Sequence, residues 1–162
     1  MFDFAARTDA DTATIWDDLV GAADGVTAGE RDGIANMANV AALCWELLPD
    51  LNWAGFYRMI EGELVLGPFQ GRAACIRIAL GQGVCGTAAA TATTQRIDDV
   101  HAFPGHIACD AASASELVVP IVVAGRVVGV LDLDSPTPSR FTAEDAAGAE
   151  KLCALIAERL VG

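Results

Sequence analysis

Apolar residues recur every three or four positions in one segment near the start of the chain and in another at its end. This spacing puts them on one face of a helix, so each segment is expected to be an amphipathic helix, and a further helix precedes the first. Pro49 ends the first stripe because proline has no amide hydrogen to donate. The last helix should open at Thr142, with Asp145 three residues later in a variant of the capping box. The two stripes are Ile34, Met37, Ala41, Cys44 and Leu48, and Ala146, Ala149, Cys153, Ile156 and Leu160.

Between these helices the chain alternates short apolar runs with turn residues, the pattern of hairpin-linked strands. Tight turns are expected at Glu61-Gly62 and at Ala124-Gly125, and the stretch from Gly67 to Gly71 is expected to break its strand. The expected strands are 52–59, 64–66, 75–78, 116–123 and 127–134, with a short helix over 84–93. Helices on both sides of such a run predict an α+β fold, an antiparallel sheet with the N- and C-terminal helices packed on one face. One domain over 1–162 is expected.

Strand periodicity also groups polar and aromatic side chains. Trp53 and Tyr57 are four residues apart in one expected strand and therefore share a face. Asp132 and Asp134 likewise share a face, opposite to the leucines at 131 and 133. Glu116 opens the strand that pairs with them and could add a third carboxyl group. Periodicity alone leaves open whether the two aspartates face solvent or a pocket.

Charge and composition exclude several classes of partner. The 162 residues carry a net charge of −12, and 53% of them are hydrophobic, which is typical of a globular protein. Such a negative charge repels nucleic acid and anionic membrane surfaces, so we expect neither as a partner. The start of the chain lacks the basic and apolar regions of a secretory signal, and no apolar run is long enough to cross a bilayer. We therefore expect a cytoplasmic protein whose thiols are kept reduced.

The five cysteines fall into two groups. Cys44 and Cys153 lie on the apolar stripes, where cysteine packs as a small hydrophobic residue. Cys75, Cys85 and Cys109 lie beside glycine-rich turns or on a loop, where an accessible thiol can react. No two cysteines have the spacing of a zinc site, so we expect no metal. The three loop and turn cysteines are therefore candidates for redox chemistry.

Six segments of the chain form a recognisable set of motifs: Asn-Trp-Ala-Gly-Phe-Tyr at 52–57, Gly-Pro-Phe-Gln-Gly at 67–71, Ala-Cys at 74–75, Gly-Val-Cys-Gly-Thr-Ala at 83–88, Phe-Pro-Gly-His-Ile-Ala-Cys-Asp at 103–110 and Ser-Glu-Leu-Val-Val-Pro at 115–120. Together they resemble the free methionine-(R)-sulfoxide reductases. The resemblance covers nearly the whole chain and implies a GAF-like domain. It also implies reduction of the R-sulfoxide of the free amino acid, a defence against oxidative stress that needs no cofactor.

The resemblance implies a role for each of the three cysteines. Cys109 would be the nucleophile, Cys75 the resolving cysteine and Cys85 an additional redox thiol. Chemically, a thiolate attacks the sulfoxide sulfur, methionine leaves and the cysteine becomes a sulfenic acid. A second thiol condenses with the sulfenic acid to give an intramolecular disulfide. An external dithiol must then reduce this disulfide, and thioredoxin is the expected reductant.

The resemblance also places Glu116, Asp132 and Asp134 around the substrate. Crowded carboxyl groups cannot all ionise easily, so one of them retains a proton at neutral pH. A protonated carboxyl could donate to the sulfoxide oxygen and an ionised one could bind the substrate ammonium; which group does which stays open. Trp53 and Tyr57 would contact the thioether, because sulfur packs well against aromatic rings.

Two histidines lie in the segment before Cys109. His101 and His106 are expected to shape the loop around Cys109, with activation of its thiol as the alternative.

The competing function is a small-molecule binding module, above all a stand-alone redox sensor that uses the same cysteines. Release of methionine over many turnovers separates an enzyme from a sensor. A homodimer is expected from the resemblance alone.

Overall fold

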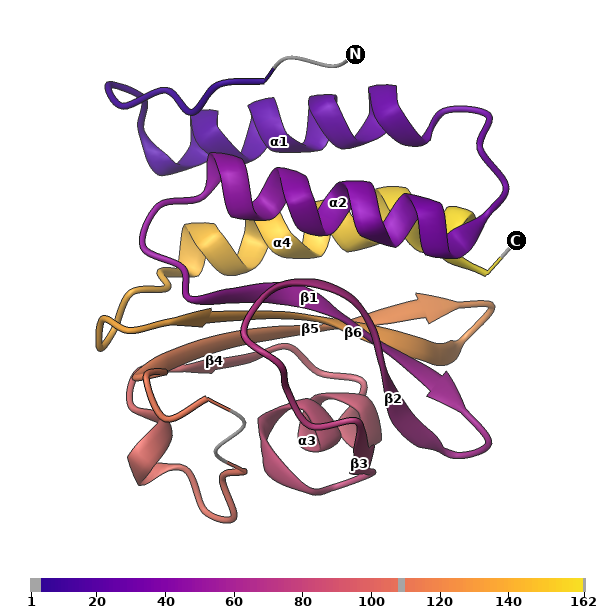
Figure 1. The fold of residues 1–162 in the computed structure, drawn as a ribbon, viewed down its shortest axis with the longest axis vertical. Coiled ribbons are helices and arrows are strands. Elements are labelled where there is room, and N and C mark those ends of the chain that lie inside the picture. Colours follow the sequence, from indigo (N-terminus) through magenta and orange to yellow (C-terminus); the bar gives the residue numbers. More distant parts are fainter. Residues whose placement is uncertain (1–3, 108–109, 162) are drawn as a thin grey trace.

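The computed structural model describes residues 4–107 and 110–161. Three helices cover one face of a curved sheet in two layers: in Figure 1 the purple and yellow helices lie next to the sheet, and the indigo helix packs on those two on the side away from the sheet. They are α1 (Thr12–Thr27), α2 (Gly33–Leu47) and α4 (Ala143–Ile156), and α4 continues into the short 3-10 helix η2 (Ala157–Leu160). Among the described residues, no helix combines the length and the apolar character needed to cross a membrane.

The sheet has six strands in the order β3-β2-β1-β6-β5-β4, and all pairs are antiparallel. The strands are β1 (Trp53–Ile60), β2 (Glu63–Gly71), β3 (Arg77–Ala79), β4 (Gln95–Ile97), β5 (Ser115–Val123) and β6 (Arg126–Ser135). The helix α3 (Gly83–Thr91) and the 3-10 turn η1 (Val100–Ala102) lie across the sheet from the other helices. The expected α+β fold, with terminal helices on one face, is confirmed.

The two hairpin turns and the N-terminal cap of α4 form at the residues that the sequence predicts. Both hairpin turns have positive φ at their two central residues, with Ala124 at 49° and Gly125 at 75° in the β5–β6 turn. This backbone twist matches the right-handed twist of the flanking strands and favours glycine. At the start of α4 the capping box is complete, because Thr142 accepts from the amide of Asp145 and Asp145 accepts from the amide of Thr142.

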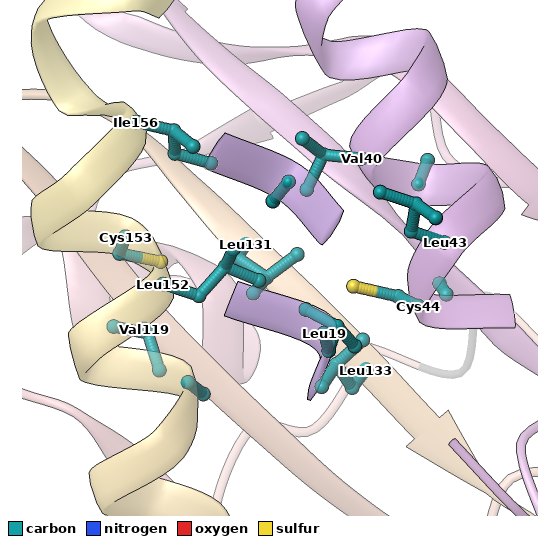
Figure 2. Packing of buried hydrophobic residues seen from close by; sticks show 14 of the residues in the cluster. Leu19, Val40, Leu43, Cys44, Val119, Leu131, Leu133, Leu152, Cys153 and Ile156 are labelled. Carbon is teal, nitrogen blue, oxygen red and sulfur yellow. The ribbon is translucent and has the colours of Figure 1, made fainter. Parts of the chain in front are cut away.

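The main hydrophobic core lies between the sheet and the three packed helices. Leu131 and Leu133 of β6 point into it, as do Val40 of α2 and Leu152 of α4 (Figure 2). The sulfur atoms of Cys44 and Cys153 also point into this layer, and both residues are buried. Their packing role, expected from the helical stripes, is confirmed. A second, smaller cluster on the other face of the sheet includes Trp53, Tyr57, Val84, Cys85 and Val118.

Two expectations about this architecture are wrong. The second strand does not break at Gly67 but continues through Pro68 to Gly71. Pro68 is tolerated because β3 pairs only with Glu63 to Val65, so no neighbouring strand needs a donor from the proline, and the pairing with β1 shifts register at this point. Ile34, expected in the core, is 46% exposed because it lies in the first turn of α2, where it borders an open surface groove.

The strand boundaries differ in two more places. The short third strand begins at Arg77 rather than at Cys75. The sequence also gave no signal for β4, whose three residues pair with Glu116 to Val118 of β5. A three-residue strand is too short to show alternation, so its existence depends on the partner strand that it pairs with.

Candidate active site

The strand register brings three carboxyl groups together on the face of the sheet that carries α3. Asp134 of β6 lies directly opposite Trp53 of β1 on one side and Glu116 of β5 on the other. In the next row Asp132 lies between Gly55 and Val118. Residues directly opposite each other in a sheet point to the same face. The aspartates therefore face a pocket rather than bulk solvent, which sequence periodicity left open.

Two small adjoining cavities lie against these carboxyl groups. The first, of about 30 Å³, is bounded by the start of α3, by the loop after η1 and by the sheet. The second, of about 10 Å³, reaches the aromatic side chains of Trp53 and Tyr57. Both cavities are lined by Asp110, Asp132 and Asp134. Volumes of this size hold about one water molecule each, so the site is closed around its polar groups.

Burial raises the pKa values of all three carboxyl groups, and the charge of Asp132 raises those of Glu116 and Asp134 further. Glu116 and Asp132 are each 6% exposed, and Asp134 is 9% exposed. Burial raises the pKa of Asp132 to about 6, although hydrogen bonding with Cys85 and Glu116 opposes the shift. The pKa values of Glu116 and Asp134 lie well above their usual range, first because of burial and then because of the charge on Asp132. The cluster therefore holds protons at neutral pH.

Asp132 has an oxygen that needs a donor. Its Oδ1 is buried and finds no hydrogen-bond partner among the described residues. A buried acceptor without a partner is costly. A proton held by the neighbouring Glu116, or the ammonium group of a ligand, would satisfy it.

Cys85 belongs to the same cluster. Its thiol donates a hydrogen bond to Oε1 of Glu116, with 3.9 Å between sulfur and oxygen. Burial raises the pKa of Cys85 well above its usual value, and the charges of Asp132 and Glu116 raise it further, so the thiol stays protonated. The ligand atoms of Cys85, Glu116 and Asp132 lie within 4.8 Å of one another, a spacing that a metal ion could also bridge.

An aromatic wall connects the carboxyl groups to Cys75. The ring of Trp53 stacks on Phe69 and on Tyr57, with centroids 5.1 Å and 5.9 Å apart. Trp53 Nε1 donates to the carbonyl of Arg72 at 3.0 Å, and the Tyr57 hydroxyl donates to the carbonyl of Cys75 at 3.0 Å. These two bonds hold the segment after β2 over the pocket. Cys75 itself is half-buried and disulfide-bonded, whereas Cys85 is a free thiol.

The chain agrees with known proteins over most of its length. The GAF domain family matches residues 36–160. The free methionine-R-sulfoxide reductase of Escherichia coli (strain K12) is 58% identical over 127 residues, which cover 78% of this chain and 77% of that protein. A protein of the same name from Saccharomyces cerevisiae is 45% identical over 141 residues, 82% of this chain and 78% of that protein.

A solved structure agrees equally well. The X-ray structure of free methionine-R-sulfoxide reductase from Neisseria meningitidis in complex with its substrate has a TM-score of 0.93 and 40% sequence identity. The match covers 98% of this chain and 96% of that chain. The protein belongs to the free methionine-R-sulfoxide reductase family of GAF domains. The resemblance carried by the six motifs is therefore confirmed.

In this family member the motif loop is anchored on both sides of the cysteine that the sequence suggests as nucleophile. Cys109 itself lies outside the described residues. Before it, His106 Nε2 lies 3.8 Å from Oε2 of Glu116, and burial lowers the pKa of His106. After it, Asn52 Nδ2 donates to Oδ2 of Asp110 and to the hydroxyl of Ser113, each at 3.1 Å. The loop is thus fastened to the start of β1 and to β5.

Sequence reasoning missed several residues of this site. Asn52, Asp110 and Ser113 fall within or beside the quoted motifs, but no spacing indicates that they contact one another. His106 was interpreted as a residue that shapes its loop, and its contact with Glu116 agrees with that role while also placing it at the cavity. The only signal for Asp110, Ser113 and His106 was their position around Cys109, and the only signal for Asn52 was its place in the first of the six motifs.

Proposed function

We propose that the protein reduces free L-methionine-(R)-sulfoxide to L-methionine. The observation that carries the proposal is the buried cluster of Glu116, Asp132 and Asp134, which adjoins the aromatic wall of Trp53 and Tyr57. Two relatives, from Escherichia coli and Saccharomyces cerevisiae, are called free methionine-R-sulfoxide reductases, which supports the same activity.

The cluster suits the two ends of this substrate. An ionised carboxylate can accept hydrogen bonds from the ammonium group of a free amino acid, and the unpartnered Oδ1 of Asp132 is a candidate acceptor. The aromatic rings of Trp53 and Tyr57 offer favourable contacts to the thioether sulfur and its methyl group. A peptide-bound methionine sulfoxide has no ammonium group, so the site should favour the free amino acid.

The chemical step needs a proton, which we assign to the carboxyl cluster. The Cys109 thiolate attacks the sulfoxide sulfur, and the sulfur–oxygen bond of the substrate breaks as its oxygen is protonated. Overall, the thiol of Cys109 and the sulfoxide become a sulfenic acid and a thioether, so the cysteine sulfur loses the two electrons that the substrate sulfur gains. A carboxyl that is still protonated at neutral pH, because burial raises its pKa, can supply the proton.

Recycling needs a second thiol and an external reductant. The Cys75 thiol attacks the sulfenic sulfur of Cys109, a disulfide forms and water leaves. The bond from Tyr57 to the Cys75 carbonyl supports this role, because it holds the Cys75 segment over the pocket. Cys85 is a poorer attacking thiol because its raised pKa keeps it protonated, and we assign it to a later exchange. Thioredoxin is the reductant that we propose, in a cytoplasmic setting.

Turnover with each epimer tests this function. The reduced protein, thioredoxin, its reductase and NADPH should consume the free R-sulfoxide and release methionine, with little activity on the S epimer. The same assay on a peptide-bound sulfoxide should be much slower. A redox sensor, the alternative function, would consume at most one equivalent of oxidant per protein and release no methionine, and that result would contradict the proposal.

A further inference from the structure

A third cavity lies at the opposite ends of the strands that build the candidate active site. It has a volume of about 420 Å³ and opens between the end of β1, the β5–β6 hairpin and η2. Most of its walls are apolar, from Met37 of α2, Ile60 of β1, Val128 of β6 and Leu160 of η2. In Figure 1 this region lies near the chain end marked C. A volume of this size is within the range of small-molecule sites.

Two arginines line this cavity, Arg58 of β1 and Arg126 of β6, and none of the residues that line it is acidic. This is unusual in a chain with a net charge of −12. Among the described residues, four of the ten lysine and arginine side chains have neither a hydrogen bond nor an ion pair: Arg31, Arg58, Arg72 and Arg126. Two of these four therefore converge on one cavity.

Arg58 is also incompletely satisfied. Its Nε is buried and has no hydrogen-bond partner in the described part of the chain. A buried guanidinium nitrogen without an acceptor is costly, and two cations facing one cavity repel each other. An anion between the guanidinium groups of Arg58 and Arg126 would offset this repulsion.

We propose that this cavity binds a small anionic amphiphile, a carboxylate attached to an apolar chain. The carboxylate would accept hydrogen bonds from Arg58 and Arg126, since a guanidinium matches the geometry of a carboxylate. The apolar chain would lie along Met37, Val128 and Leu160. An adjoining cavity beyond Arg58 includes Asp32, whose charge would turn the head group toward Arg126. This site is independent of the proposed reductase activity.

Calorimetric titration with octanoate at low salt tests the proposal directly. Octanoate should bind with saturation at one site per chain, octan-1-ol more weakly, and octylammonium least. Arg58→Gln and Arg126→Gln should each weaken octanoate binding by about tenfold or more, the effect of losing one hydrogen bond to a charged group. Arg72→Gln and Arg31→Gln remove the same charge elsewhere and should leave binding unchanged.

Three results would overturn the proposal. One is equal affinity for octanoate and octylammonium, which would mean that the arginines do not select an anion. The second is unchanged binding in Arg126→Gln, an exposed position whose substitution should not disturb folding. The third is self-association of the wild-type protein in sedimentation experiments, without octanoate binding and with dissociation by Arg58→Gln. That result would mean that a second copy of the chain occupies the cavity. None of these measurements depends on methionine sulfoxide.

Discussion

Glu116 of β5 and Asp134 of β6 lie directly opposite each other in the sheet, and both are buried. Like charges at opposed positions destabilise a sheet, and burial adds a desolvation cost for each carboxylate. The pair is therefore stable mainly with a proton bound. This relationship provides the proposed reductase with a protonated carboxyl group beside its substrate pocket.

Substitutions of the three carboxyl groups should differ in whether they change kcat or KM. If one of Glu116, Asp132 and Asp134 protonates the leaving oxygen, its amide variant should lose kcat by roughly 10²–10⁴-fold, as is typical for general acid catalysis. A variant that loses only an ammonium contact should mainly raise KM, provided that binding equilibrates before chemistry. Steady-state kinetics of Glu116→Gln, Asp132→Asn and Asp134→Asn with saturating reductant will sort them. Wild-type kcat and KM in all three would remove the carboxyl groups from the mechanism.

Stability should fall as the pH rises through the carboxyl pKa values. Because the pKa of Asp132 is raised to about 6 in the folded protein, the folded state binds more protons than the unfolded state above about pH 4. The contribution of this one group should decrease by roughly 2 kcal/mol between pH 4 and pH 7. Glu116 and Asp134, whose pKa values are also raised, should extend the decline to higher pH.

Chemical denaturation at several pH values measures this effect. Asp132→Asn should be about as stable as the wild type near pH 4 and more stable at pH 8, while its activity is impaired. Glu46→Gln, an exposed change on α2, is the matched control and should follow the wild type. A wild-type stability that rises between pH 4 and pH 8 would contradict the raised pKa values.

Cys109→Ser should abolish turnover, because an alcohol is a far weaker nucleophile than a thiolate at neutral pH. The coupled thioredoxin assay measures the loss, and unchanged thermal unfolding would show that the variant is folded. Normal steady-state turnover would move the nucleophile to another cysteine.

Cys75→Ser should leave the first step intact and block recycling. About one methionine per chain should form in a burst, followed by a sulfenic acid that dimedone traps on Cys109. Rapid-quench measurement of methionine gives the burst amplitude. If Cys75→Ser still turns over slowly, and only the variant lacking both Cys75 and Cys85 stops, Cys85 substitutes as the resolving thiol. Turnover of Cys75→Ser at the wild-type rate would exclude Cys75 from this role.

Cys44→Ala should keep its activity and lose stability by roughly 1 kcal/mol, because the thiol packs in the main core and burial raises its pKa to about 12. Cys153→Ala should behave in the same way. Denaturant unfolding and the turnover assay check both halves of the expectation. A folded Cys44→Ala protein without activity would show that the packed thiols take part in the chemistry.

Local pattern determined much of this molecule. Helical spacing marks α2 and α4, and the turns at Glu61-Gly62 and Ala124-Gly125 set two hairpins because their residues match the required backbone twist. Strand alternation put Asp132 and Asp134 on one face. These features depend on neighbours a few residues apart, and a sequence displays such neighbours directly.

Only the tertiary structure decided which faces are buried and which distant groups meet. Pro68 stays in a strand because β3 does not reach it, and Ile34 is exposed because it borders an open surface groove at the start of α2. Asn52 meets Asp110 across 58 positions of the chain. The approach of Arg58 to the cavity that it shares with Arg126 likewise depends on the pairing of β1 with β6. Such contacts follow from register and packing between segments, and those are properties of the whole fold rather than of any local stretch.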